Sequence, residues 1–191
     1  MTWTQTRDGH AISLVPPIDI TTLSIEEVAH SLARLARFSG HTRGAVPYSV
    51  AQHSVHVAEH LSGFGQQVEL DGLLHDAHEA LLGDITSPVK SALRHYGGGY
   101  ALDELDNTLA AAIHDRFGGG APGRHSVKVV DLRMLATERR DLLGKEAKPW
   151  LLSVDGATCE PYAERIVPWY ISQAEEAFLE RYNALLGAQA G

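Results

Sequence analysis

The stretch that decides the fold of this chain covers residues 75–79 and reads HDAHE. It places the imidazole of His75 directly beside the carboxylate of Asp76. An isolated histidine, His53, lies upstream and an aspartate, Asp131, lies downstream, each inside an apolar pattern with helical spacing. Imidazole and carboxylate groups together form a ligand set suited to a divalent metal ion. The sequence therefore predicts a metal site built from neighbouring helices, and it favours a hydrolase.

Helical periodicity places both isolated residues on the inward side of their helices. In the segment 49–61 an apolar stripe includes His53, and in the segment 126–143 a similar stripe includes Asp131. Burying a lone aspartate on such a stripe costs several kcal/mol unless it is paired or binds a metal. For any single residue the ordinary alternative stays open: a buried histidine held by hydrogen bonds, or an aspartate that pairs with an arginine. Shared coordination of one cation would explain both residues together.

Most of the remaining chain also has helical periodicity. Asp8-Gly9 lies between the short segments 3–7 and 10–15 and predicts a β-hairpin at the start of the chain. A capping box at residues 24–27 predicts the beginning of the first helix. The predicted helices cover residues 25–36, 49–61, 68–82, a short segment from 87, 100–117, 126–143 and 172–186. Residues 118–123 predict a loop, and residues 149–169 predict an irregular connection with an Asp-Gly turn. The expected fold class is all-α with a small N-terminal β-hairpin.

Length and composition limit the classes of protein. The chain has 191 residues, 44% of them apolar and 21% charged, which predicts one compact domain over residues 1–191. A net charge of −8 argues against binding to duplex nucleic acid, although a few converging cations suffice for a small anion. The single cysteine, Cys159, and the lack of a long apolar run favour a cytoplasmic protein that does not cross a membrane.

The order of the candidate ligands resembles a known signature. His53, then His75-Asp76, then Asp131 is similar to the ligand pattern of the HD-domain metal-dependent phosphohydrolases, an all-α superfamily. Residues 75–90, HDAHEALLGDITSPVK, resemble the corresponding stretch of bacterial 5'-deoxynucleotidases and of phage deoxynucleoside triphosphate hydrolases. The resemblance implies that the chain is a single HD-type phosphohydrolase domain, a helical bundle that acts on a small nucleotide.

The resemblance also implies the roles of the acidic and histidine residues. One divalent ion (Mn, Co, Zn, Mg or Fe) would be held by His53, His75, Asp76 and Asp131. Glu79 matches the family's catalytic glutamate, which orients or deprotonates the attacking water, and Asp84 matches an aspartate with a general acid/base role. Ordinary alternatives remain for both carboxylates, because Glu79 could be a solvated helix residue and Asp84 could cap the turn after Gly83.

Substrate residues are implied in the same way. Arg37, Lys90 and Lys128 match positions that contact phosphate. An isolated lysine is most often a solvated surface cation, but Lys128 lies one turn before Asp131 and close to the same face. Phe38 stands where deoxynucleotidases commonly carry a tryptophan that shapes the sugar pocket. This departure leaves sugar and base selectivity open.

Other histidines are weaker candidates. His56 and His60 are four residues apart on one helix, but no carboxylate partner is evident for them, so a partly exposed polar face explains them equally well. His78 could line the pocket or remain solvated. A second metal site is therefore not expected.

Several functions stay open on the sequence alone. The leading one is a triphosphohydrolase of deoxynucleoside triphosphates, with dATP among the substrates, and the alternative is a 5'-deoxynucleotidase acting on monophosphates. A non-catalytic nucleotide sensor is a third class, although a glutamate suited to activating water argues against it. Oxygen activation by two irons would need further ligands, and cleavage of cyclic dinucleotides would need a Gly-Tyr-Pro signature. Family members form dimers or larger assemblies, so a homo-oligomer is expected.

Overall fold

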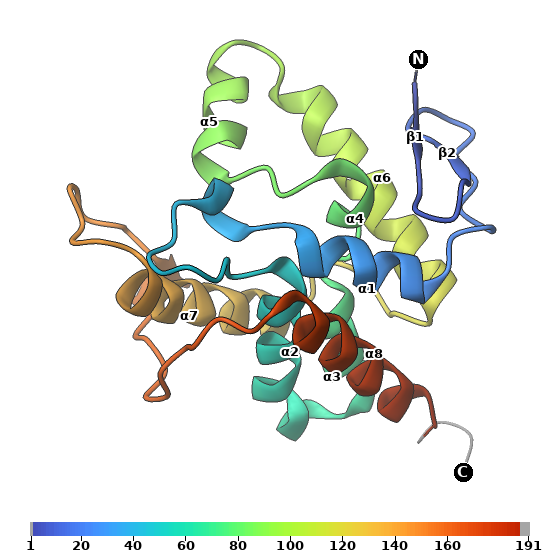
Figure 1. The fold of residues 1–191 in the computed structure, drawn as a ribbon. Coiled ribbons are helices and arrows are strands. Elements are labelled where there is room, and N and C mark those ends of the chain that lie inside the picture. The colour runs from blue at the N-terminus through green and yellow to red at the C-terminus, as the bar shows by residue number, and fades with distance from the viewer. Residues whose placement is uncertain (1, 188–191) are drawn as a thin grey trace.

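The computed structural model describes residues 2–187, and these residues are mostly helical (Figure 1). The helices are α1 (Ile25–Arg34), α2 (Val50–His60), α3 (Gln66–Leu74), α4 (Glu79–Leu82), α5 (Ser87–His95), α6 (Gly99–Phe117), α7 (His125–Leu142) and α8 (Ile171–Gly187). Two antiparallel strand pairs are β1 (Trp3–Gln5) with β2 (Ala11–Ser13) and β3 (Ser153–Val154) with β4 (Ala157–Thr158). The prediction of a mostly helical chain with a small N-terminal hairpin is confirmed.

The main core lies where α8 crosses α1, α2 and α3 (Figure 1). Leu32 of α1, Leu73 of α3 and Phe178 of α8 are completely buried in it. Burial of each such side chain contributes about 1.5–3 kcal/mol. A smaller apolar cluster, which includes Val57 and Met134, packs α7 against α2. The two clusters hold α2, α3 and α7 close together, and these are the helices that carry the candidate ligands.

The N-terminal hairpin is fixed to α1 by one buried carboxylate, Glu27. Its Oε2 accepts the backbone N–H of Ser24, and the Ser24 hydroxyl accepts the backbone N–H of Glu27, which is the predicted capping box. Its Oε1 accepts the backbone N–H of Asp8 in the turn between β1 and β2. The residue that begins the helix therefore also fixes the position of the hairpin.

The predicted helix over residues 68–82 is wrong in one respect, because the structure divides it. α3 ends at Leu74, a turn with i→i+3 hydrogen bonds covers residues 75–78, and α4 begins at Glu79. The Gly72 carbonyl accepts a hydrogen bond from Nδ1 of His75 at 2.7 Å, and this side-chain bond competes with the backbone bond that would continue the helix. His75 and Asp76 consequently lie at the end of a helix, where their side chains can turn toward α2 and α7.

The first helix also ends earlier than predicted. It stops at Arg34 instead of residue 36, since Leu35 is extended and Ala36 forms a bridge with Ser49. A short 3₁₀ segment, Arg37–Gly40, follows, in which Phe38 has a φ of 55°. Such a left-handed conformation costs a residue with a side chain about 1–2 kcal/mol. The strained turn directs Arg37 toward the candidate ligands.

α5 and the first half of α6 extend away from the main core (Figure 1), whereas Leu109, Ile113 and Phe117 in the second half of α6 belong to that core. Every residue of α5 is at least partly exposed, and its apolar side chains Val89 and Leu93 are among the exposed large hydrophobic groups. Thr86 is its N-cap residue, and Ser87 and Pro88 begin its first turn. Among residues 2–187, no helix combines the length and the apolar character needed to cross a membrane.

Candidate metal centre

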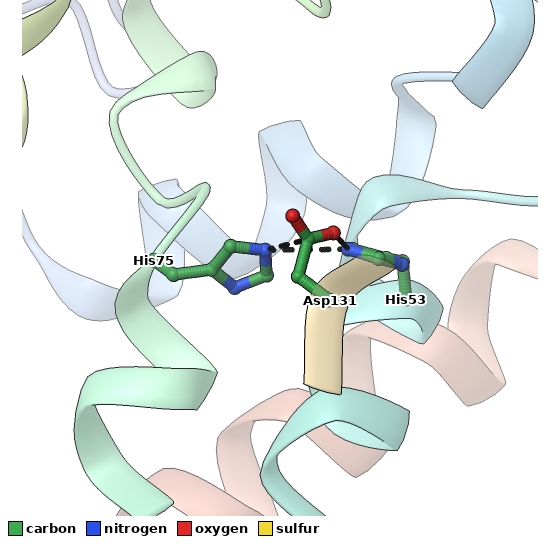
Figure 2. Close-up of side chains that lie close together, drawn as sticks. All are labelled: His53, His75 and Asp131. Carbon is green, nitrogen blue, oxygen red and sulfur yellow. Dashed lines mark hydrogen bonds and ion pairs between the residues drawn. The ribbon is translucent and has the colours of Figure 1, made fainter. Parts of the chain in front are cut away.

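Three helices bring His53, His75 and Asp131 together (Figure 2). His53 lies in the middle of α2, His75 follows the last residue of α3, and Asp131 lies in the second turn of α7. The Nε2 atoms of the two imidazoles are 3.2 Å apart, and Oδ1 of Asp131 lies 3.4 Å from His53 Nε2 and 4.0 Å from His75 Nε2. These atoms face a common space, as expected for ligands of one metal ion.

Asp76 adds a second carboxylate to the same space. Its Oδ2 lies 3.1 Å from Nε2 of His75 and 3.6 Å from Nε2 of His53. Ligands about 2.0–2.2 Å from one ion lie roughly 3.0–3.5 Å from each other. The measured separations of 3.1–4.0 Å are close to that range. His53, His75 and Asp131 therefore form one group of potential ligands, and Asp76 lies 3.1–3.6 Å from both imidazoles, where it could serve as a further ligand of a small divalent cation.

The outer nitrogen of each imidazole is already used. Nδ1 of His75 donates to the Gly72 carbonyl, and Nδ1 of His53 donates to Oε1 of Glu138 at 2.5 Å. A carbonyl or carboxylate oxygen can only accept, so the proton of each neutral ring is on Nδ1. Each Nε2 then has a free electron pair directed into the shared space, which is the arrangement typical of histidines that bind metal ions.

The charges of the cluster match a cation of two positive charges. Burial opposes ionisation of Asp131, but a hydrogen bond with His53 and the charges of His75 and His53 together outweigh it and lower the pKa of Asp131 to about 2. Burial likewise opposes ionisation of Asp76, yet the nearby His75 holds the pKa of this carboxyl well below its usual range. Burial and Arg37 act against a charge on His53, but Glu138 and Asp131 outweigh them and raise its pKa to about 9. A divalent ion would take the place of that proton between two ionised carboxylates.

Glu79 and Asp84 lie beside this cluster, and their pKa values are raised, whereas those of Asp76 and Asp131 are lowered. Glu79 is 6% exposed, and its Oε2 has no hydrogen-bond partner among the residues that the structure describes. Burial, followed by the charges of Asp76 and Asp84, raises the pKa of Glu79 to about 10. Burial also raises the pKa of the partly exposed Asp84. The alternative of a solvated helix residue is therefore wrong for Glu79.

Comparison with known proteins places the chain in a family. No family model matches it. It is 35% identical over 200 residues to an uncharacterized protein of Rhodobacter capsulatus, covering 99% of this chain and 98% of that protein. It is 33% identical over 161 residues to the uncharacterized protein YfdR of Escherichia coli K12, covering 84% of this chain and 83% of YfdR. The chain belongs to the family of these two proteins. Both relatives are described as uncharacterized, so they assign no function to this chain.

Two of the predicted phosphate-binding residues lie at the candidate metal centre. Arg37 is almost fully buried, and its Nη1 lies 3.3 Å from Oδ2 of Asp76. Nζ of Lys128 lies 3.5 Å from Oδ2 of Asp131, while the rest of the lysine side chain is largely exposed. Both cations therefore contact ligand carboxylates from outside the shared space.

The other two predicted substrate residues lie further out. Nζ of Lys90 is 3.2 Å from both oxygens of Asp106 in α6, and Asp106 also contacts Nε2 of the buried His78. The Phe38 ring is partly exposed and lies 6.3 Å from the ring of Trp150. Lys90 thus contacts Asp106 and Phe38 lies near Trp150, and the structure does not bring either residue into contact with the four candidate ligands.

The weaker histidine candidates have structural partners. The ring of His60 stacks on Tyr162 at a centroid distance of 3.6 Å. Nδ1 of His56 lies 3.2 Å from a carboxylate oxygen of Glu59 on the surface of the same helix. These contacts agree with the interpretation of both histidines as ordinary residues of a partly exposed face.

Sequence reasoning missed Glu138, which is completely buried beside His53. Its charge partners Arg37 and His53 outweigh burial and lower the pKa of its carboxyl, so the group is ionised. A signal was available in the sequence: Glu138 lies seven residues after Asp131, and residues seven apart share one face of a helix. A second acidic residue on the apolar face of this helix could have been recognised as a partner of the cluster.

Proposed function

We propose that this chain is a metal-dependent phosphohydrolase of the HD-domain type that acts on deoxynucleotides. The observation that carries the proposal is the convergence of two imidazole Nε2 atoms and two ionised carboxylates, with both Nδ1 atoms held by other acceptors. This donor set suits Mn, Co, Zn, Mg or Fe. When bound, such an ion lowers the pKa of a coordinated water and polarises a phosphate oxygen.

The residues around the ligands support hydrolysis rather than binding alone. Glu79 is buried beside Asp76, and its Oε2 has no partner in residues 2–187, so this atom is available to exchange a proton with a water or a leaving group. Asp84 contributes to the raised pKa of Glu79 and is partly exposed, so a second carboxyl group close to Glu79 reaches solvent. A nucleotide sensor would have no need of such an unpaired buried carboxyl.

Cations at the rim support an anionic substrate. Arg37 and Lys128 contact the ligand carboxylates Asp76 and Asp131, and phosphate oxygens would compete for the same donors. Lys90, held by Asp106, would complete the phosphate contacts after a change of side-chain conformation. The proposal includes a small nucleotide as substrate, with triphosphates such as dATP preferred, a cytoplasmic location and a homo-oligomeric state. Hydrolysis of monophosphates by a 5'-deoxynucleotidase is the alternative.

A product screen tests the proposal. The purified chain is incubated with each common deoxy- and ribonucleoside mono- and triphosphate in the presence of Mn, Co, Mg or Zn, and products are separated by chromatography. We expect deoxynucleoside and intact triphosphate from the deoxynucleoside triphosphates. Release of single phosphate from monophosphates would establish the alternative. Intact metal binding without turnover of any nucleotide would contradict hydrolysis and favour the sensor.

A further inference from the structure

One buried carboxylate, that of Glu138, connects a candidate metal ligand to a candidate phosphate ligand. Its Oε1 accepts from Nδ1 of His53 at 2.5 Å. Its Oε2 accepts from Nε and Nη2 of Arg37 at 3.2 and 3.1 Å. The third guanidinium nitrogen of Arg37, Nη1, contacts Asp76. Glu138 itself is fully excluded from solvent.

The two oxygens of Glu138 make different contacts, and only a carboxylate can make both. Each oxygen faces a nitrogen that donates a proton, so the group at this position must accept on both sides. An amide of the same shape has one acceptor and one donor. In one orientation, the amide would point its N–H group at the Arg37 guanidinium, which cannot accept it. In the other orientation, the amide would donate to Nδ1 of His53, and the ring proton of His53 would then move to Nε2.

We propose that Glu138 is a positioning residue of the metal centre. It holds His53 in the tautomer whose Nε2 electron pair faces the cation, and it fixes Arg37 beside that cation with one guanidinium edge directed toward the ligands. The part that concerns Arg37 rests on the proposed function, because it assigns phosphate to Nη1, which contacts Asp76 in this structure. The part that concerns His53 requires only that the centre binds a metal.

A merely structural buried ion pair between Glu138 and Arg37 predicts something different. Replacement of Glu138 would then lower the thermal stability and leave metal affinity and the tautomer of His53 unchanged. Positioning predicts a loss of metal affinity, since removal of a carboxylate that supports a ligand histidine typically weakens binding about 10–100-fold. These outcomes are separable in one set of variants.

The test compares Glu138→Gln with the wild type and with Glu69→Gln. Glu69 is a matched control, since it is also buried and ion-paired, with Arg181, but lies away from the four ligands on α3. Zinc affinity is measured by competition with a chelator. Long-range ¹H–¹⁵N spectra of the zinc-loaded proteins report which ring nitrogen of each histidine carries the proton. His75, whose Nδ1 donates to the Gly72 carbonyl, serves as an internal reference.

We expect the wild type to show protonated Nδ1 and metal-bound Nε2 at both histidines. Glu138→Gln should bind zinc about 10–100-fold more weakly, with the signals of His53 changed and those of His75 retained. Glu69→Gln should resemble the wild type. Unchanged zinc affinity in Glu138→Gln, a wild type that binds no zinc, or a wild-type His53 protonated at Nε2 would each overturn the proposal. The last two results need no variant, so a misfolded Glu138→Gln leaves the test intact.

A kinetic measurement addresses Arg37 separately. At saturating metal, Glu138→Gln should raise the KM for the nucleotide more than it lowers kcat, because Arg37 loses its fixed position. An unchanged KM would contradict the part of the proposal that concerns Arg37. If the wild type turns over no nucleotide while zinc affinity and the His53 spectrum respond as expected, the proposed function fails and the positioning of His53 stands.

Discussion

At the scale of single residues, the centre separates carboxylates by their surroundings. Asp76 and Asp131 face imidazoles, which hold the pKa of each carboxyl below its usual value, whereas burial and neighbouring carboxylates raise the pKa of Glu79 to about 10. Groups with such opposite acidities at one place are typical of sites that hold a cation and move a proton. The proposed division of roles is therefore ligands on one side and a proton carrier on the other.

Glu79→Gln tests this division. The amide keeps the shape of the side chain but cannot exchange a proton, so we expect turnover to fall about 100–10,000-fold. Because Glu79 is not one of the four ligands, metal content should stay that of the wild type. Nucleotide turnover and metal per chain are measured on the same preparation, with Glu69→Gln as the control. A Glu79→Gln variant with full activity would refute the role of this residue in proton transfer.

At the scale of secondary-structure elements, Glu27 joins the N-terminal hairpin to α1. Burial acts to raise its pKa, but hydrogen bonds from Thr6 and from the backbones of Ser24 and Asp8 outweigh burial and lower the pKa from 4.5 to about 2. A carboxyl with a lowered pKa in the folded state stabilises the protein above the pKa of the unfolded chain. This contribution is complete above about pH 4.5 and is lost as the pH falls toward 2.

Glu27→Gln should therefore destabilise the fold in a pH-dependent way. At pH 7 we expect a loss of about 1–2 kcal/mol in the free energy of unfolding, since the charge is lost and the amide has one accepting oxygen in place of the two that bind Ser24 and Asp8. The difference from the wild type should shrink between pH 5 and pH 2. Denaturant unfolding at several pH values measures it, and Glu26→Gln, an exposed neighbour in the same turn, is the control. A difference that stays constant with pH would contradict this assignment.

The sequence predicted the helices more reliably than their breaks. The long amphipathic helix predicted at 100–117 is observed as α6, because its length and periodicity are local properties. The division between α3 and α4 depends on a bond from the His75 ring to the Gly72 carbonyl, and no apolar pattern contains that bond. In the same way, the four ligands could be predicted from type and spacing, and spacing also places Glu138 on the face of Asp131, but its bonds to Arg37 and His53 depend on how α7 packs against α2.

At the scale of the whole molecule, α7 contacts the other helices through the apolar cluster with Val57 and Met134 and through the candidate metal centre, to which it contributes Asp131. Glu138 of α7 adds hydrogen bonds to His53 and Arg37. The helices α1, α2, α3 and α8 share the larger core. A bound metal should therefore connect α7 to the rest of the molecule.

Metal removal should loosen α7 first. A ligand at 100 times its Kd stabilises the folded state by about 2.7 kcal/mol. Removing the metal ion takes this stabilisation away, and local opening should increase most in the helix that the ion connects to the others. We expect faster amide hydrogen exchange in α7 after chelation, with little change in α8. Exchange followed by mass spectrometry on metal-loaded and chelated protein measures this. Equal changes in α7 and α8, or none, would argue against the metal as a link between helices.

The most direct test of the account is a count of bound metal. Wild-type protein and Asp131→Ala are titrated with Mn, Co and Zn, and the stoichiometry and Kd are determined by calorimetry. We expect one ion per wild-type chain and a Kd at least about 100-fold higher in Asp131→Ala, because one of the four candidate ligands is removed. A wild type that binds no ion, or an Asp131→Ala variant that binds as tightly as the wild type, would contradict it.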